Sequence, residues 1–309
     1  MTFIILNTRE NEEIAVFEIK NLYKKIKNRI ILNNITMEIP SKSIVGFIGP
    51  NGAGKTTTFK LCCGISSINS GEILINDISI KKDFEQYMSK IGSSLNNTNF
   101  YNKFTAIENA KIFSSPFRVN DKKIEETIEL VGLSNRKDSL VGTYSLGMRQ
   151  RLSIALSILH EPEIVFLDEP FNGVDPKGIQ DLRKIIKTIC NEKGTSFIVS
   201  SHNLGEISKI ASQNYYINNG KIVKQDKGTL LHSMVDIKVN NPEAFINVLN
   251  EMAIDFSSEG NFFFLCVKND LLNSLFNKIL LNNITILEFS SGTHLEKKYL
   301  EMMGESEIE

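Results

Sequence analysis

Apolar and polar positions alternate along the first part of the chain, in the pattern expected of β-strands with one buried face. The alternation runs through residues 14–39 and returns in GEILINDISI, where Asn76 and Asp77 predict a hairpin turn. Between these stretches, residues 43–48 form a nearly continuous apolar run, which is typical of a strand buried on both faces. A helical pattern begins at Lys55, directly after a short glycine-rich stretch.

The middle of the chain alternates between helical and strand-like patterns. Residues 83–162 are mostly helical in pattern, with breaks at Gly and Asn, and a helical pattern returns at residues 179–190. Strand-like segments follow these helices at residues 163–170, 195–202 and 214–223. Helices that alternate with near-continuous apolar strands predict an α/β fold, with a site at the carboxyl ends of the strands.

Beyond Gly228 a second series of strand-like and helical segments begins. The strand-like segments DIKVN, NFFFLCVK and ITILEF alternate with two helical segments, which predicts a small βαβαβ module of α+β type. Thr293 and Glu296 have the spacing of a capping box and predict a final helix. We therefore divide the chain into an N-terminal extension (residues 1–13), a large α/β domain (residues 14–229) and a C-terminal accessory module (residues 230–309).

Composition narrows the class of protein. The chain has 309 residues, of which 41% are hydrophobic and 23% charged, as is ordinary for a globular protein. Its formal net charge of −1 provides no overall field that would favour nucleic acid or anionic lipid. The four cysteines form no C-x-x-C pair, which predicts reduced thiols in a cytosolic protein. No segment resembles a secretion signal and no apolar run approaches the ~20 residues that span a bilayer, so we expect a partner to supply any membrane span.

The segment FIGPNGAGKTTTF carries the first candidate chemistry. Its residues 49–56 have the spacing G-x-x-x-x-G-K-[ST], in which successive backbone N–H groups surround phosphate groups. In this pattern Lys55 reaches the outer phosphates and the hydroxyl of Thr56 binds Mg²⁺. The preceding strand and the following helix aim a helix N-terminus at the anion. A plain glycine-rich turn is the alternative, but it would not explain Lys55 and Thr56 together.

The segment IVFLDEP carries the second set of candidate catalytic residues. A strand that ends in two adjacent carboxylates places them at the same edge of the sheet as the phosphate loop. Asp168 can then hold Mg²⁺ through water, while Glu169 can orient and deprotonate an attacking water. An acidic strand end is common on its own, but it is less expected beside a phosphate loop in the same chain.

With these motifs, residues 16–223 resemble the nucleotide-binding subunit of an ATP-binding cassette (ABC) transporter. YSLGMRQR resembles the family signature, with Ser145 and Gly147 at its serine and second-glycine positions. NGVDP resembles the D-loop with Asp175 as its acid, and SSH ends in His202 at the place of the switch histidine. The resemblance implies a P-loop NTPase cassette with a mixed sheet core and a helical subdomain, which hydrolyses ATP with Mg²⁺ to drive transport.

The resemblance also assigns the remaining site residues. The catalytic residues it implies are Lys55, Glu169 and His202, and the metal ligands are Thr56, Asp168 and Asn96. The residues implied to contact ATP are Gly49, Pro50, Asn51, Gly52, Ala53, Gly54, Lys55, Thr56, Thr57, Ile26, Ser145, Gly147 and Asp175.

The signature segment also has a physical reading of its own. Ser145 precedes an apolar-periodic run and predicts a helix N-cap, so the start of that helix forms a second anion site. One chain has no evident use for two such sites. In the family, two subunits pack head to tail and each signature closes the ATP site of the other, which is an isologous twofold arrangement. The resemblance therefore implies an ATP-dependent homodimer and an integral membrane permease of the ABC-2-like type, with this subunit in the cytoplasm at the inner face of the membrane.

Several positions depart from the common family pattern. Leu146 replaces the first glycine of the signature and Met148 replaces its usual glutamine. Asn96 replaces the glutamine of the Q-loop, and Ile26 stands where an aromatic residue normally stacks on adenine, with Tyr23 nearby in sequence. From Ile26 we expect weak ATP binding and poor discrimination between ATP and GTP.

The signature and the Q-loop region resemble the branch of the family that exports bacitracin-like and lantibiotic-like peptide antibiotics. We therefore expect this subunit to power antibiotic export for resistance or immunity. The alternatives are a soluble ABC ATPase linked to ribosomes or nucleic acid, or a regulatory cassette. A single cassette, the absence of sustained heptads and intact Lys55, Asp168, Glu169 and His202 disfavour them.

Overall fold

The computed structural model describes residues 15–95, 100–227, 232–254 and 256–291. A six-stranded sheet with strand order β10-β9-β3-β8-β7-β6 forms its centre. Its strands β9, β3, β8, β7 and β6 are parallel, and β10 pairs with β9 in antiparallel orientation. The strands of this sheet are β3 (Ile44–Ile48), β6 (Ile91–Ser94), β7 (Ile164–Asp168), β8 (Ser196–Ser201), β9 (Gln213–Asn218) and β10 (Lys221–Lys227).

Every residue of the inner strand β3 is buried, which agrees with its nearly continuous apolar sequence. Its glycine is required by a close approach of neighbouring elements. A Cβ at Gly46 would lie 2.2 Å from Asn214 Oδ1 on β9 and 2.4 Å from Ile207 Cγ2. Asn214 and Ile207 can therefore pack this closely against β3 only because residue 46 has no side chain.

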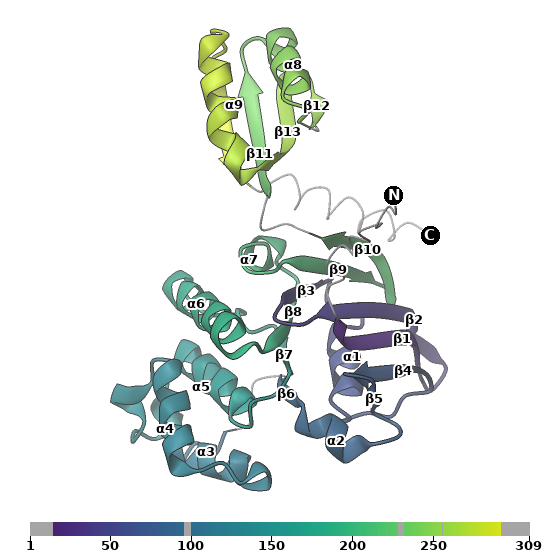
Figure 1. Cartoon of the computed structure of the whole chain (residues 1–309), viewed down its shortest axis with the longest axis vertical. Helices are drawn as coiled ribbons and strands as arrows, with labels where there is room; N and C mark the ends of the chain where they lie inside the picture. The colour runs from purple at the N-terminus through teal and green to yellow at the C-terminus, as the bar shows by residue number, and fades with distance from the viewer. Residues whose placement is uncertain (1–14, 96–99, 228–231, 255, 292–309) are drawn as a thin grey trace, which may run out of the picture.

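A second sheet, with strand order β2-β1-β4-β5, is antiparallel. Its strands are β1 (Ala15–Ile26), β2 (Arg29–Pro40), β4 (Ser70–Ile75) and β5 (Ile78–Ser79), and helix α1 (Lys55–Cys62) packs beside it (Figure 1). The predicted hairpin turn is confirmed, since Ile75 pairs with Ile78 and both turn residues, Asn76 and Asp77, have positive φ. Phe59 of α1 lies edge-on to Phe166 of β7 at 5.2 Å, which joins the two sheets in one core.

The opposite face of the six-stranded sheet is covered by helices. They are α3 (Ala106–Ser114), α4 (Asp121–Leu130), α5 (Leu146–Ile158), α6 (Pro176–Lys193) and the short α7 (Leu204–Ile207), while α2 (Phe84–Ser89) follows β5. Thr105 begins α3 with a capping box, and Asn120 and Ser145 cap α4 and α5 with their side-chain oxygens. Residues 83–162 are not wholly helical, because IGSS forms β6 at the edge of the sheet. That strand is short and half polar, and only its parallel pairing with β7 defines it.

The C-terminal module has its own sheet and its own hydrophobic core. Its elements are β11 (His232–Val239), α8 (Pro242–Glu251), β12 (Phe256–Glu259), β13 (Phe262–Lys268), α9 (Asn269–Leu281) and β14 (Ile286–Ser291). The predicted βαβαβ order is wrong by one strand. A hairpin turning at Gly260 (φ 60°) adds β12, so the order is βαββαβ with the antiparallel strand order β12-β13-β11-β14, as in ferredoxin-like folds.

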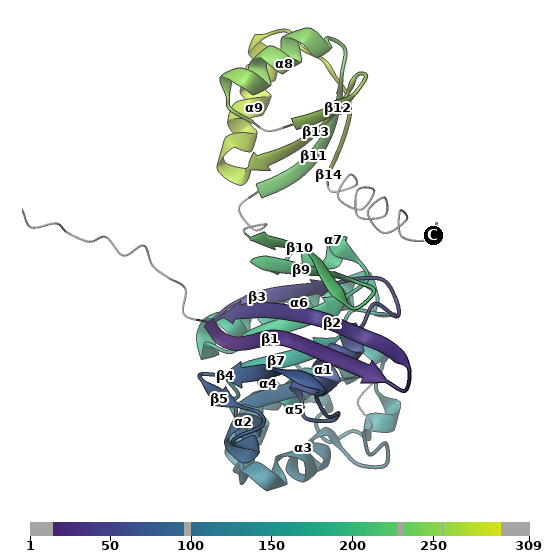
Figure 2. The same cartoon turned by 90° about the vertical axis from the view of Figure 1, so that its right-hand side faces the viewer.

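The two views place this module at one end of the molecule, with α3, α4 and α5 toward the other (Figures 1 and 2). The predicted extension at residues 1–13 and the capping box at Thr293 and Glu296 lie outside the described residues. In the part of the chain that the structure describes, no helix is long and apolar enough to cross a membrane.

Candidate functional site

The phosphate loop connects the end of β3 to the start of α1. Gly52 (φ 84°) and Gly54 (φ 114°) adopt backbone conformations that strongly favour glycine, and the loop N–H of Gly49 donates to the carbonyl of Ser201 at the end of β8. Gly54 is the N-cap residue of α1 and no side chain caps the helix. The first N–H groups of α1 are therefore left for a ligand at the positive end of the helix dipole.

Lys55 is the first residue of α1, and its side chain is turned back onto the loop. Its Nζ donates to the carbonyl oxygens of Gly49 at 2.6 Å and Pro50 at 3.1 Å. It also lies 3.3 Å from Glu169 Oε1, an ion-pair distance without the alignment of a hydrogen bond. Only 6% of the lysine side chain is exposed, so the ammonium group is held in a polar, largely enclosed position.

Asp168 ends β7 and faces the loop. Its Oδ2 accepts a hydrogen bond from Thr56 Oγ1 at 2.8 Å, and its Oδ1 accepts one from Ser200 Oγ at 2.5 Å. The parallel register brings this about, since Asp168 pairs with Ser200 of β8. A carboxylate and a threonine hydroxyl in contact provide two hard oxygen ligands, which fits Mg²⁺.

Glu169 follows directly and has a positive φ of 49°, an uncommon conformation for a non-glycine residue. Its backbone N–H donates to Ser200 Oγ at 2.9 Å. Its Oε2 lies 2.9 Å from His202 Nδ1, while its Oε1 faces Lys55. The strained backbone thus turns this carboxylate away from Asp168 and toward a lysine and a histidine.

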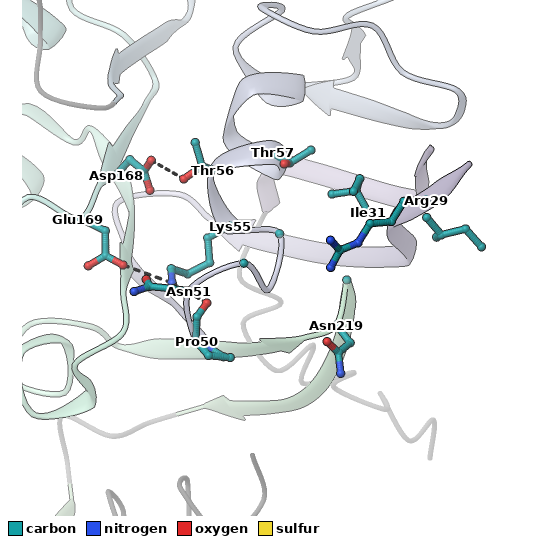
Figure 3. A pocket seen from close by; sticks show the side chains of 14 residues that line it. Arg29, Ile31, Pro50, Asn51, Lys55, Thr56, Thr57, Asp168, Glu169 and Asn219 are labelled. Atoms are coloured by element: carbon teal, nitrogen blue, oxygen red, sulfur yellow. Dashed lines mark hydrogen bonds and ion pairs between the residues drawn. The ribbon is translucent and has the colours of Figure 1, made fainter. Parts of the chain in front are cut away.

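A cavity of about 490 Å³ joins the phosphate loop, Asp168 and Glu169, while His202 borders Glu169 without lining it. Figure 3 shows Asp168 and Glu169 on one side of the phosphate loop and Arg29, Ile31 and Asn219 on the other. Its lining residues are Arg29, Ile30, Ile31, Pro50, Asn51, Gly52, Gly54, Lys55, Thr56, Thr57, Asp168, Glu169, Asn219 and Gly220. The structure therefore brings the phosphate loop and the acidic pair together at one cavity.

Other predicted site residues lie elsewhere. Ile26, at the tip of the β1–β2 hairpin, is 48% exposed and is not part of the cavity lining. Ser145 and Asp175 are the N-caps of α5 and α6, where their side chains accept from the N–H groups of Met148 and Gly178. Asn96 lies outside the described residues.

The segment that contains Ser145 and Gly147 lies beside the one that precedes Asp175. A Cβ at Gly147 would be 3.6 Å from Val174 Cγ1, and one at Gly173 would be 3.1 Å from Leu146 Cδ2. None of these residues lines the cavity formed by their own chain.

Sequence reasoning missed Ser200, Arg29 and Asn219. Ser200 is the first residue of SSH, two positions before His202, so its place on a strand parallel to the acidic strand was an available signal. Arg29 begins β2 directly after the β1–β2 turn, Asn219 lies in the β9–β10 turn, and neither belongs to a recognisable motif. Hydrogen bonds from Gly220 N to Ala53 O (2.9 Å) and from Asn33 N to Gly220 O (2.7 Å) link the β9–β10 turn to the phosphate loop and to β2.

Comparison with known proteins places this geometry in context. The family described as ABC transporter matches residues 32–172. The chain is 34% identical over 301 residues to the uncharacterized ABC transporter ATP-binding protein YhcH of Bacillus subtilis (strain 168), which covers 96% of this chain and 98% of that protein. It is 36% identical to the bacitracin transport ATP-binding protein BcrA of Enterococcus faecalis, over 70% of this chain and 71% of BcrA. It is 38% identical to the lantibiotic transport ATP-binding protein SrtF of Streptococcus pyogenes, over 67% of this chain and 89% of SrtF.

Solved structures of ABC transporter cassettes share the fold. The dimeric structure of MJ0796, a bacterial ABC transporter cassette, matches with a TM-score of 0.62 and 22% sequence identity, and the match covers 68% of this chain and 98% of that one. At this identity the match supports the fold, and the fold is the α/β cassette that the motifs predicted.

Proposed function

The chain belongs to the ATP-binding proteins of ABC transporters, and we propose that it binds and hydrolyses ATP in the cavity beside Lys55 to drive export through a separate membrane permease. One observation carries the assignment to this cavity. The Thr56–Asp168 pair and the Lys55–Glu169 pair meet at a single phosphate loop, so groups for a metal, a phosphate and an attacking water lie together.

We assign the phosphate groups to the uncapped N–H groups at the start of α1 and to the side chain of Lys55. Lys55 must leave the carbonyls of Gly49 and Pro50 to reach the outer phosphate, which its flexible stem permits. Mg²⁺ would be held by Thr56 and Asp168, with Asn96 as the proposed amide ligand, and would neutralise phosphate charge when bound. Ser200 keeps Asp168 in place through its hydrogen bond.

Glu169 is assigned as the general base. Its carboxylate stays within reach of the cavity and lies against His202, which we assign to contact with the outer phosphate. Proton transfer from an attacking water to a positioned carboxylate contributes on the order of 10²-fold to 10⁴-fold in rate. The positive φ of Glu169 supports this role, because it aims the side chain away from the metal ligand Asp168.

The second half of each ATP site is assigned to another copy of the chain. Ser145, Gly147 and Asp175 lie outside their own chain's cavity, at the exposed starts of α5 and α6. A head-to-tail homodimer would bring them to the partner's nucleotide, with the N-terminal end of α5 facing the outer phosphate. Dimer formation would then depend on ATP.

Relatives support the choice of cargo. BcrA and SrtF are named for bacitracin and lantibiotic transport, and both align with most of the cassette. We propose that this chain drives export of peptide antibiotics through an ABC-2-like permease, from a position in the cytoplasm at the inner face of the membrane. Residues 14–229 would form the ATPase domain and residues 230–309 an accessory module.

Complementation between two variants tests the shared sites. Ser145→Arg should bind nucleotide at its own loop but not complete the partner's site, whereas Lys55→Ala should lose nucleotide binding. In a mixture, one site of each heterodimer carries both substitutions and the other carries neither. ATP hydrolysis by the mixture above that of either variant alone is expected, and a mixture as inactive as its components would contradict the head-to-tail assignment.

Resistance measurements test the cargo. Deleting the gene should raise the susceptibility of its host to bacitracin or a lantibiotic. A plasmid copy should restore growth, whereas a plasmid copy with Lys55→Ala should not. Unchanged susceptibility to both classes, in cells whose purified protein hydrolyses ATP, would contradict peptide export while leaving the ATPase assignment intact.

A further inference from the structure

The end of the cavity away from Asp168 and Glu169 is built by residues to which the proposed ATPase mechanism gives no role. Arg29, Ile30 and Ile31 come from the start of β2, and Asn219 and Gly220 come from the turn between β9 and β10. Figure 3 shows the Arg29 guanidinium directed into the cavity at this end. The start of β2 and the β9–β10 turn bound this end of the cavity, a slot that continues from the phosphate loop.

We propose that this slot binds the base of the nucleotide, that Arg29 provides the flat surface on which the base stacks, and that Asn219 hydrogen-bonds the edge of the base. The proposal rests on the function proposed above. A nucleotide whose outer phosphates lie at Lys55 must extend its base toward another part of the lining. The end that contains Arg29 lies on the opposite side of the loop from the acidic residues.

Arg29 can take the place that the sequence assigned to Ile26. The two residues pair across the β1–β2 hairpin, so they are cross-strand neighbours at its tip. Only Arg29 lines the cavity, and Ile26 is 48% exposed. A guanidinium group is planar and weakly hydrated, so it can stack on an aromatic ring. An isoleucine side chain has no flat face and cannot stack in this way.

The side chains of Arg29 and Asn219 are available to a ligand. Within the residues that the structure describes, the side chains of Arg29 and Asn219 make no hydrogen bond or ion pair. The Asn219 amide carries both a donor and an acceptor, a combination that matches the amino group and ring nitrogen of adenine better than the two acceptors of guanine. Ile30 and Ile31 add apolar surface beside them.

Binding of ADP and of inorganic tripolyphosphate to the full chain tests the stacking role. ADP is chosen because it lacks the outer phosphate on which dimer formation would depend. Arg29→Ala should weaken ADP binding about tenfold, which corresponds to ~1.4 kcal/mol, as expected for loss of a stacked base. Tripolyphosphate binding should stay unchanged, because its phosphates do not reach Arg29.

Two further variants separate stacking from charge. Arg29→Lys keeps the charge without the flat surface, so it should lose most of the ADP affinity that Arg29→Ala loses. Lys25→Ala removes a cation from the same hairpin, at a residue that does not line the cavity, and should change neither affinity. Asn219→Ala should bring the affinities for ADP and GDP closer together.

Failure of the Arg29 stacking role and failure of the proposed ATPase function give different results. Equal weakening of ADP and tripolyphosphate in Arg29→Ala, or full affinity in Arg29→Lys, would show that Arg29 binds phosphate and would overturn the stacking role. Unchanged ADP binding in Arg29→Ala would place the base elsewhere. A wild-type chain that binds neither ADP nor tripolyphosphate would instead contradict the proposed function itself.

Discussion

Replacing Glu169 with glutamine should stop ATP turnover and at the same time tighten nucleotide binding. The substitution keeps the size of the side chain and removes its charge. The carboxylate lies 3.3 Å from Lys55 Nζ and 2.9 Å from His202 Nδ1, so both groups assigned to the outer phosphate are held by Glu169 before nucleotide binds. Loss of the base should lower hydrolysis by a factor on the order of 10² or more.

The effect on binding follows from the same contacts. A unit ion pair at the 3.3 Å separation of Lys55 and Glu169 is worth roughly 5 kcal/mol at an effective dielectric constant of about 20. The net effect is much smaller, because the Glu169 side chain is 22% exposed and the lysine keeps its two bonds to loop carbonyls. We expect Glu169→Gln to bind ATP about tenfold more tightly, equivalent to ~1.4 kcal/mol.

Three measurements check this prediction. Phosphate release gives the rate, titration with ADP and ATP gives the affinities, and size-exclusion chromatography with ATP and Mg²⁺ should reveal a trapped dimer. Glu163→Gln is the matched control, because Glu163 is paired with Lys90 and does not line the cavity. A Glu169→Gln variant that hydrolysed ATP at the wild-type rate would refute the base assignment. Unchanged affinity for both nucleotides would show that Glu169 does not restrain Lys55.

Three other predictions concern stability, thiol chemistry and domain structure. Gly46→Ala places a methyl group 2.2 Å from Asn214 Oδ1 and should destabilise the protein by about 1–3 kcal/mol in urea unfolding, whereas Gly205→Ala, with its nearest atom at 3.4 Å, should have little effect. Cys62 and Cys63 are buried, and burial raises the pKa of Cys63 to about 12, so iodoacetamide at pH 8 should modify them only after unfolding, as mass spectrometry would reveal. A chain truncated after residue 229 should stay soluble and bind ATP, because its buried clusters exclude the C-terminal module, and a folded truncation that bound no ATP would place the boundary elsewhere.

Local features of this protein were readable from the sequence because their signals lie within a few neighbouring residues. The glycine spacing of residues 49–56, the turn at Asn76 and Asp77 and the N-cap at Ser145 each depend on local backbone chemistry, and the structure has a loop, a turn and a cap at these places. Strand β12 escaped prediction because FSSE is short and mostly polar, and only pairing with β13 makes it a strand.

The sequence by itself determined the α/β class, the phosphate loop and the acidic strand end, since periodicity and spacing are properties of consecutive residues. Only the tertiary structure decided which distant residues share the cavity. The parallel pairing of β7 with β8 sets Ser200 against Asp168, and backbone hydrogen bonds through Gly220 bring the β9–β10 turn to the loop beside Arg29. Such contacts arise from the register of strands far apart in the chain, which no local pattern of residues specifies.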